Sequence, residues 1–256
     1  FRYSSGFACS DTEEKTFHVT GEKIRGMEKR LIIGTVDSDI LLEKAHSYDS
    51  SVTAFLTAIM LQALMEIQNS SVPKKKQKAV KVSVPVDLRR LYGSRTVRNF
   101  VLALNIGVDP RQGEYSLRDL CSVAQHQLKA RATKQYMAGM IAQNTLPQRI
   151  TVLRLAPLAV KGLVMKLVYS YRGEKAGSIT ISNLGVHRLP ERLGKYIEKM
   201  DFTIGVQKSY FNNCSVVSYG GKTRISIIRS LTESELERLF FSKLVEQGIP
   251  VEIESN

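Results

Sequence analysis

Residues 177–185, with the sequence Gly-Ser-Ile-Thr-Ile-Ser-Asn-Leu-Gly, constrain the fold of this chain more than any other stretch. Two isoleucines alternate with hydroxyl-bearing side chains, and this period of two predicts a strand with one buried face. The strand runs into Asn183 and Gly185, two residue types that tolerate the left-handed backbone of a tight turn. Polar groups at the end of a rigid strand suit a binding or catalytic surface, although the pattern also fits a strand that simply enters a turn.

The rest of the chain predicts strands and helices in irregular alternation. From residue periodicity we expect strands over 17–21, 30–36, 79–86, 99–108, 201–207, 213–219, 222–229 and 249–254. We expect helices over 39–46, 52–67, about 20 residues from 116, 155–169, and from 233. Expected helix caps are Ser38, Ser51 and Ser116, with a capping box formed by Thr232 and Glu235. The hairpins near the end favour an α+β fold, a mixed and mostly antiparallel sheet covered by helices, over a doubly wound parallel sheet.

The net charge of +13 is concentrated in one part of the chain. Nine Lys or Arg residues lie between Lys74 and Arg98, against Asp87 alone. Such a patch can bind nucleic acid by neutralising phosphates, can attract a phosphorylated cofactor such as coenzyme A, or can simply keep a loop in solvent. The run of lysines within residues 69–78 predicts an exposed basic loop.

The sequence lacks the groups of a complete catalytic site. None of its four histidines has an aspartate at the H-x-x-x-D spacing, and there is no nucleophile elbow, zinc motif or phosphate loop. The three cysteines are far apart and fit no disulfide framework or metal site, which favours a reducing cytoplasm; they are Cys9, Cys121 and Cys214. No apolar run reaches the roughly 18 residues of a membrane span.

Residues 180–185, Thr-Ile-Ser-Asn-Leu-Gly, resemble the strand of the same sequence in the acyltransferase core of 2-oxoacid dehydrogenase complexes, whose fold is shared with chloramphenicol acetyltransferase. In that family a hairpin, an H-x-x-x-D-G motif and a helix follow. The same order follows here, but Ser230 stands near the place of the histidine and Ser234 near that of the aspartate.

A second resemblance involves Val-Ser-Val-Pro-Val-Asp-Leu-Arg over residues 82–89, followed by Arg-Asn-Phe over 98–100. It is similar to the V-P-V-x-L-R…N segment of larger chloramphenicol acetyltransferase-like enzymes: wax-ester synthases, plant acyltransferases and peptide-synthetase condensation domains. These contain two copies of the fold, of which the first carries H-H-x-x-x-D-G. The resemblance implies that residues 1–36 are crossover strands from a missing N-terminal half and that residues 37–256 are the C-terminal domain. Within the superfamily, the bacterial alcohol acetyltransferases look most similar.

The resemblance also implies a mechanism. A histidine in the missing half would activate an alcohol or amine acceptor, which would attack an acyl-coenzyme A thioester. Ser182 best matches the family's oxyanion donor, and Asn183, Arg89 and Asn99 would line or brace the channel between the halves. The alternative is that Asn183 and Asn99 only close turns and that Arg89 pairs with a local carboxylate such as Asp87.

We therefore expect acyl-coenzyme A as co-substrate, no metal, and a cytoplasmic location. The expected partners are the missing N-terminal half of the protein and a small-molecule acceptor. We expect no membrane span, and the sequence does not decide whether the protein forms an oligomer. Two alternatives remain: a catalytically inactive binding module that keeps the fold, and a basic nucleic-acid-binding protein. The second lacks a recognisable recognition helix, zinc finger or aromatic RNA-binding signature.

Overall fold

The computed structural model describes residues 15–26, 28–149, 157–168, 176–207 and 210–256. A seven-stranded mixed sheet organises it, with the strand order β3-β2-β4-β5-β6-β1-β7. Pairs β2–β4 and β4–β5 are parallel, and the others are antiparallel. The strands are β1 (Arg30–Asp37), β2 (Val80–Asp87), β3 (Val101–Val108), β4 (Ile179–Val186), β5 (Asn212–Tyr219), β6 (Lys222–Arg229) and β7 (Glu252–Ser255). This confirms the predicted α+β fold class.

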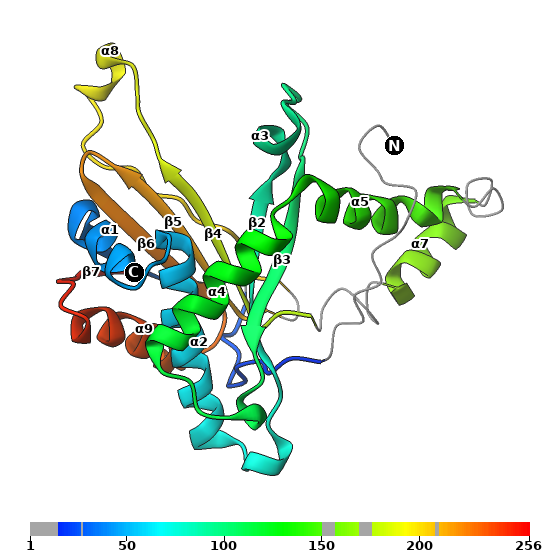
Figure 1. Ribbon diagram of the computed structural model, residues 1–256, viewed down its shortest axis with the longest axis horizontal. Helices are drawn as coiled ribbons and strands as arrows, with labels where there is room; N and C mark the ends of the chain where they lie inside the picture. The colour runs from blue at the N-terminus through cyan, green and yellow to red at the C-terminus, as the bar shows by residue number, and fades with distance from the viewer. Residues whose placement is uncertain (1–14, 27, 150–156, 169–175, 208–209) are drawn as a thin grey trace.

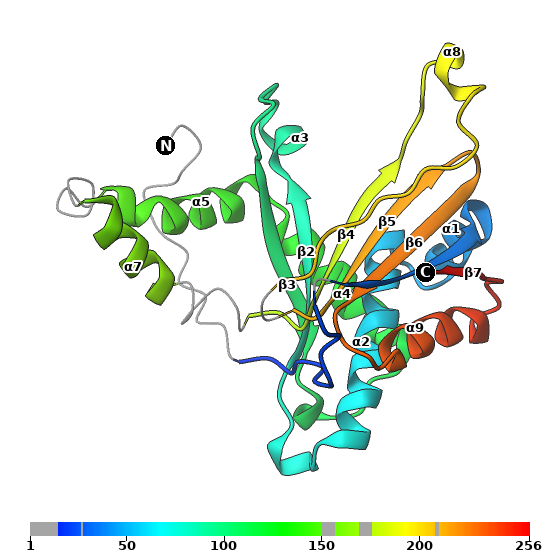
Figure 2. The same cartoon turned by 180° about the vertical axis from the view of Figure 1, so that it is seen from behind.

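Several of the helices cover one face of this sheet, and the others lie beyond its edge or at the ends of its strands (Figure 1). The helices are α1 (Ser38–Ser47), α2 (Val52–Ser71), α3 (Leu88–Tyr92), α4 (Leu117–Arg131), α5 (Lys134–Arg149), α7 (Leu158–Val168), α8 (Glu191–Gly194) and α9 (Glu235–Glu246), with short 3₁₀ turns η1 (Lys74–Lys76) and η2 (Pro110–Gln112). Figure 1 shows α2 and α4 in front of the strands, and Figure 2 shows the strands in front of these helices. The two layers enclose one hydrophobic core.

Helix α2 is the centre of that core. Ser51 caps it as predicted, accepting a hydrogen bond from the Ala54 N–H at 3.3 Å. Phe55, Ile59 and Leu64 are fully buried against the sheet and the neighbouring helices. A helix that is apolar on nearly all sides must be buried, and each such side chain contributes about 1.5–3 kcal/mol of hydrophobic stabilisation.

The opposite face of the sheet is polar where it is covered by the segment that precedes β5. Ser215 donates to the Phe202 carbonyl at 2.7 Å, and the Asn213 amide donates to the Gly205 carbonyl at 2.6 Å. Arg224 is paired with Asp201 and, at 3.0 Å, with Glu254 of β7. The predicted strand over 201–207 is therefore wrong, because these residues bond to side chains of the sheet rather than to a strand backbone.

Several predicted boundaries shift for a similar reason. Asp37, not Ser38, caps α1, because the Ser38 hydroxyl is bonded to Thr223 at 2.8 Å. The capping box on α9 is absent, since Thr232 instead donates to the Glu22 carbonyl at 3.0 Å. The helix of about 20 residues predicted from residue 116 is shorter, since α4 ends at Arg131 and a separate helix, α5, begins at Lys134.

Three further predicted elements are shorter or absent. Residues 17–21, predicted to be a strand, form none, and isolated bridges occur only on either side of them, at Thr16 and Lys23. The final strand begins at Glu252 rather than at residue 249. Of the helix predicted over 155–169, residues 155, 156 and 169 lie outside the described residues, as does Cys9.

The predicted division of the chain at residue 36 stays a prediction. Strand β1 is hydrogen-bonded to β6 on one side and to β7 on the other. In the predicted basic loop, residues 69–71 form the end of α2, and Lys74, Lys75 and Lys76 are exposed on η1. No single described helix is long and apolar enough to cross a membrane, although the bent pair α1–α2 passes that test by length and composition alone.

Candidate functional site

The candidate site is the place where the backbone pairing of β2 and β4 ends, which is called here the opening. These parallel strands are paired only at Val82–Ile179 and Ser83–Thr180. Beyond these positions β2 stays paired only with β3, and β4 only with β5. The two pairs of strands, called here the two arms, therefore separate toward α3 and α8 (Figures 1 and 2). Pro85, which has no N–H to donate, lies two residues past the last pair, where β2 has a neighbour on one side only.

Ser182 lies at this opening, two residues past the last β2–β4 pair. Ile179 and Ile181 are fully buried on the helix-covered face, so the alternation of the strand places Ser182 on the opposite face. Ser182 is half-buried and pairs in register with Ser215 of β5. Within the described part of the chain, no hydrogen bond occupies its hydroxyl. This hydroxyl is therefore available to donate to a ligand.

Asn183 has a structural role in this structure. Its Nδ2 donates to the Thr53 hydroxyl of α2 at 3.0 Å, and its Oδ1 accepts the Gly185 N–H at 2.8 Å. Gly185 has a φ of 74°, and the register of β4 shifts at this point. The side chain thus closes a turn and fastens the end of β4 to α2, which is the structural alternative predicted for it.

Arg89 braces the connection between β2 and β3. Its Nε donates to the Thr96 carbonyl at 2.8 Å, and its Nη2 donates to the Arg98 carbonyl at 2.7 Å. Its Nη1 pairs with Asp87 at 3.0 Å, the local carboxylate named in the sequence-based alternative. Asn99 is exposed on the same connection. Arg89 and Asn99 are thus on one arm and Ser182 and Asn183 on the other, and no hydrogen bond or ion pair among the described residues joins the two groups.

The described residues contain no acid–base pair at the opening. Ser230, at the place of the histidine in the H-x-x-x-D-G motif, is bonded to the Phe211 carbonyl at 3.3 Å, and Ser234 stands at the first position before α9 without a side-chain capping hydrogen bond. His46, His126 and His187 are exposed, and His18 stacks on Tyr210 with 5.7 Å between ring centroids. No group of three or more His, Cys, Asp or Glu side chains able to hold a metal occurs in the described ranges.

The two described cysteines are not activated nucleophiles. Burial raises the pKa of the Cys121 thiol to about 11 and raises the pKa of the Cys214 thiol further above its ordinary value. Both thiols therefore stay protonated at neutral pH, as expected for core residues.

The sequence analysis missed a row of hydroxyls next to Ser182. Ser215 of β5 and Ser226 of β6 continue the row across the sheet and are fully buried. The Ser226 hydroxyl has no hydrogen-bond partner among the described residues. Isolated serines at alternate positions of otherwise apolar strands are the signal that predicts such a row, once the register is known.

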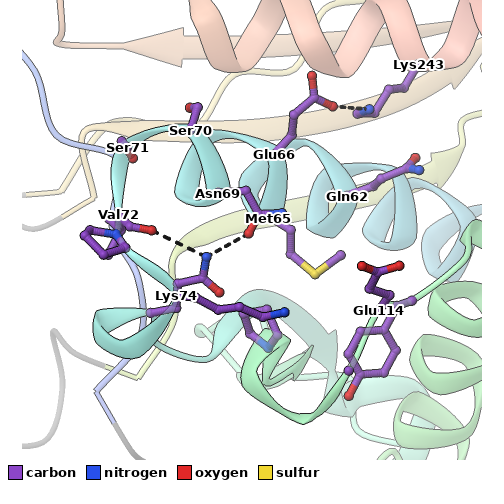
Figure 3. Close-up of a pocket in the computed structure, with 15 residues that line it drawn as sticks. Gln62, Met65, Glu66, Asn69, Ser70, Ser71, Val72, Lys74, Glu114 and Lys243 are labelled. Atoms are coloured by element: carbon purple, nitrogen blue, oxygen red, sulfur yellow. Dashed lines mark hydrogen bonds and ion pairs between the residues drawn. The ribbon is translucent and has the colours of Figure 1, made fainter.

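A cavity of about 830 Å³ lies elsewhere, between the C-terminal end of α2, η1 and η2 (Figure 3). The lysine–glutamate pair Lys243–Glu66, at 2.6 Å, lines it, and Lys74 and Glu114 approach it from other sides. Asn69, at this cavity, lies 16 residues along α2 from Thr53, which corresponds to about 24 Å of helix. The described residues that line this cavity include no nucleophile–base pair, and Ser182 is not among them.

Comparisons with solved structures identify the fold. A trichothecene 15-O-acetyltransferase, TRI3 from Fusarium sporotrichioides, matches with a TM-score of 0.59 at 12% identity over 91% of this chain and 49% of its own. The epimerization domain from the third module of tyrocidine synthetase B matches with a TM-score of 0.55 at 14% identity over 93% of this chain and 52% of its own. The PapA2 acyl transferase matches with a TM-score of 0.52 at 12% identity over 94% of this chain and 48% of its own.

This chain has the chloramphenicol acetyltransferase-like fold. It spans about half the length of these three structures. No protein-family model and no curated protein matches its sequence. The fold is thus shared with acyltransferases and with a peptide-synthetase domain, and a shared fold does not by itself assign a function to this chain.

Proposed function

We propose that this chain is the C-terminal part of an acyltransferase that transfers an acyl group from acyl-coenzyme A to a small alcohol or amine. The observation that carries the proposal is the Ser182 hydroxyl. It stands on a strand at the opening between β2 and β4, on the face away from the helices, and makes no hydrogen bond to any other residue that the structure describes. A preorganised donor of this kind stabilises the oxyanion of an acyl-transfer intermediate.

The proposed reaction divides its groups between two halves. A histidine of the upstream half takes the proton of the acceptor hydroxyl or amine, and the acceptor oxygen or nitrogen forms a bond to the thioester carbon. Ser182 donates to the oxyanion formed at that carbon. The C–S bond then breaks, and the coenzyme A thiolate receives the proton from the histidine. Only the oxyanion donor of this set belongs to the present chain.

The proposal is tested by measuring release of the coenzyme A thiol from acetyl-coenzyme A with a panel of alcohols and amines. Residues 1–256 alone should release no thiol above background, because Ser230 occupies the place of the base. The same residues joined to their upstream half should release it with at least one acceptor. Acceptor-dependent transfer by residues 1–256 alone would contradict the division into two halves.

A catalytically inactive binding module is the second candidate, and the structural roles of Ser230 and Arg89 favour it. In that case the joined protein would also release no thiol from any acyl donor. Filter binding of nucleic acid across a salt series addresses the remaining alternative, since submicromolar affinity with a steep salt slope would favour a nucleic-acid-binding protein.

A further inference from the structure

The connection between β2 and β3 carries an unusual concentration of arginine. Residues 88–100, called here the arginine hairpin, contain four arginines and no aspartate or glutamate. Arg90, Arg95 and Arg98 are exposed, and no carboxylate among the described residues pairs with them. The hairpin, with α3, stands at the end of the arm formed by β2 and β3 (Figures 1 and 2). It therefore presents three guanidinium groups to solvent on one projecting loop.

This loop is held in shape from within. The fourth arginine, Arg89, donates to the Thr96 and Arg98 carbonyls at 2.8 and 2.7 Å. Gly93 ends α3 in the left-handed conformation with a φ of 63°, and the rings of Tyr92 and Phe100 lie 6.0 Å apart. Since the loop is already ordered, an anion that binds its outer arginines pays little entropy for organising them.

The hairpin lies on the same side of the β2–β4 pairing as Ser182. From the last pair, Ser83–Thr180, Ser182 is two residues further along β4, which is about 7 Å at 3.3 Å per residue. Leu88, where the hairpin begins, is five residues further along β2, which is about 17 Å. The exposed arginines thus lie roughly 10 Å or more beyond Ser182, across the opening.

A donor that uses both places needs an acyl carbonyl at one end, phosphates at the other, and a narrow neutral linker between them. Acyl-coenzyme A has this architecture, with its thioester and its three phosphates at opposite ends of the pantetheine arm. Arginine forks bind phosphate oxygens through paired, charge-assisted hydrogen bonds.

We propose that the arginine hairpin binds the phosphates of the acyl-coenzyme A donor through Arg90, Arg95 and Arg98, and that Arg89 positions the loop. This inference rests on the proposed acyl-coenzyme A-dependent function. The other basic cluster, Lys74, Lys75 and Lys76, is excluded by topology, because it precedes β2 and so lies on the opposite side of the β2–β4 pairing from Ser182.

That lysine cluster supplies a charge-matched control. Calorimetric titrations of residues 1–256 with coenzyme A, 3′-dephospho-coenzyme A and pantetheine should give affinities that fall in this order. The triple variant Arg90→Gln/Arg95→Gln/Arg98→Gln should weaken coenzyme A binding by about tenfold or more and leave pantetheine binding unchanged. The triple variant Lys74→Gln/Lys75→Gln/Lys76→Gln removes the same charge and should change neither by more than about twofold.

Arg89→Lys is a second variant that keeps the charge but loses the forked contacts to the two carbonyls. It should weaken coenzyme A binding while the thermal unfolding midpoint of the chain shows that the fold is retained. The inference is overturned if the two triple variants weaken binding equally, if the arginine variant binds as the unaltered chain does, or if coenzyme A binds no more tightly than pantetheine.

These outcomes are separable from the fate of the proposed function. If coenzyme A binds through the three arginines but the joined protein transfers no acyl group, the hairpin assignment stands and the transferase proposal fails. If the joined protein transfers acyl groups with the same KM for acetyl-coenzyme A in the arginine variant, the transferase proposal stands and the hairpin assignment fails.

Discussion

The structure gives Asn183 a structural role, and this has a measurable consequence for stability. Its side chain donates one hydrogen bond to the Thr53 hydroxyl and accepts one from the Gly185 N–H. Each hydrogen bond of this kind contributes about 0.5–1.5 kcal/mol, so Asn183→Ala should lower the free energy of unfolding by about 1–3 kcal/mol. Thr53→Val, which keeps the branched shape of the side chain, should cost about 1 kcal/mol because it removes only one of the two bonds.

Urea unfolding of the chain, the two single variants and the double variant forms a double-mutant cycle. The interaction energy between positions 53 and 183 should be about 0.5–1.5 kcal/mol. An interaction energy near zero, with Asn183→Ala as stable as the unaltered chain, would refute the argument that this amide fastens β4 to α2. In that case the Asn183 side chain would again be a candidate for contact with a ligand.

Two further predictions concern the sheet. In urea unfolding, Gly107→Ala should lower the free energy of unfolding by about 1–3 kcal/mol, because a Cβ there would collide with the Val80 carbonyl of β2. Gly205→Ala is the control and should leave the free energy of unfolding unchanged, because a Cβ there meets nothing within 4 Å. Equal effects of the two substitutions would contradict the β2–β3 register. Arg224 and then Lys199 lower the pKa of Glu254 to about 2 from 4.5, so this carboxylate stabilises the fold above pH 4.5 and the contribution disappears as the pH falls toward 2. Glu254→Gln should therefore reduce the loss of stability over that range, and an unchanged pH profile would contradict the pairing.

The elements that sequence reasoning predicted well are those whose signals are local. Strand β4 begins with alternating apolar and polar residues, Gly220 and Gly221 mark the hairpin between β5 and β6, and α2 shows its apolar faces and its serine cap. Such patterns depend on neighbours within a few residues, and they specify strand or helix regardless of distant contacts.

The elements that were predicted wrongly are decided by contacts between distant parts of the chain. Thr232 has the spacing of a helix cap, but its hydroxyl donates instead to the carbonyl of Glu22, 210 residues earlier in the chain. Residues 201–207 have a strand-like composition, but their polar partners are the side chains of Asn213, Ser215 and Arg224. No local pattern carries such information.

The same limit applies to the candidate site. The adjacent residues Ser182 and Asn183 could be named from the strand that contains them. Their distance from Arg89 depends on where β2 and β4 stop pairing, which is a long-range property. The bracing role of Arg89 follows from its contacts with two carbonyls of the hairpin, which the sequence does not display.

The central claim is that Ser182 donates to the oxyanion of an acyl-transfer reaction, and steady-state kinetics of the joined two-half protein test it most directly. Ser182→Ala should lower kcat by about 10²–10³-fold with little change in KM, because the hydrogen bond strengthens mainly in the transition state. Ser215→Ala is the matched control, since it removes the neighbouring hydroxyl, which is already bonded to the Phe202 carbonyl, and should lower stability but not kcat. An unchanged kcat in Ser182→Ala, or an equal loss in both variants, would contradict the account.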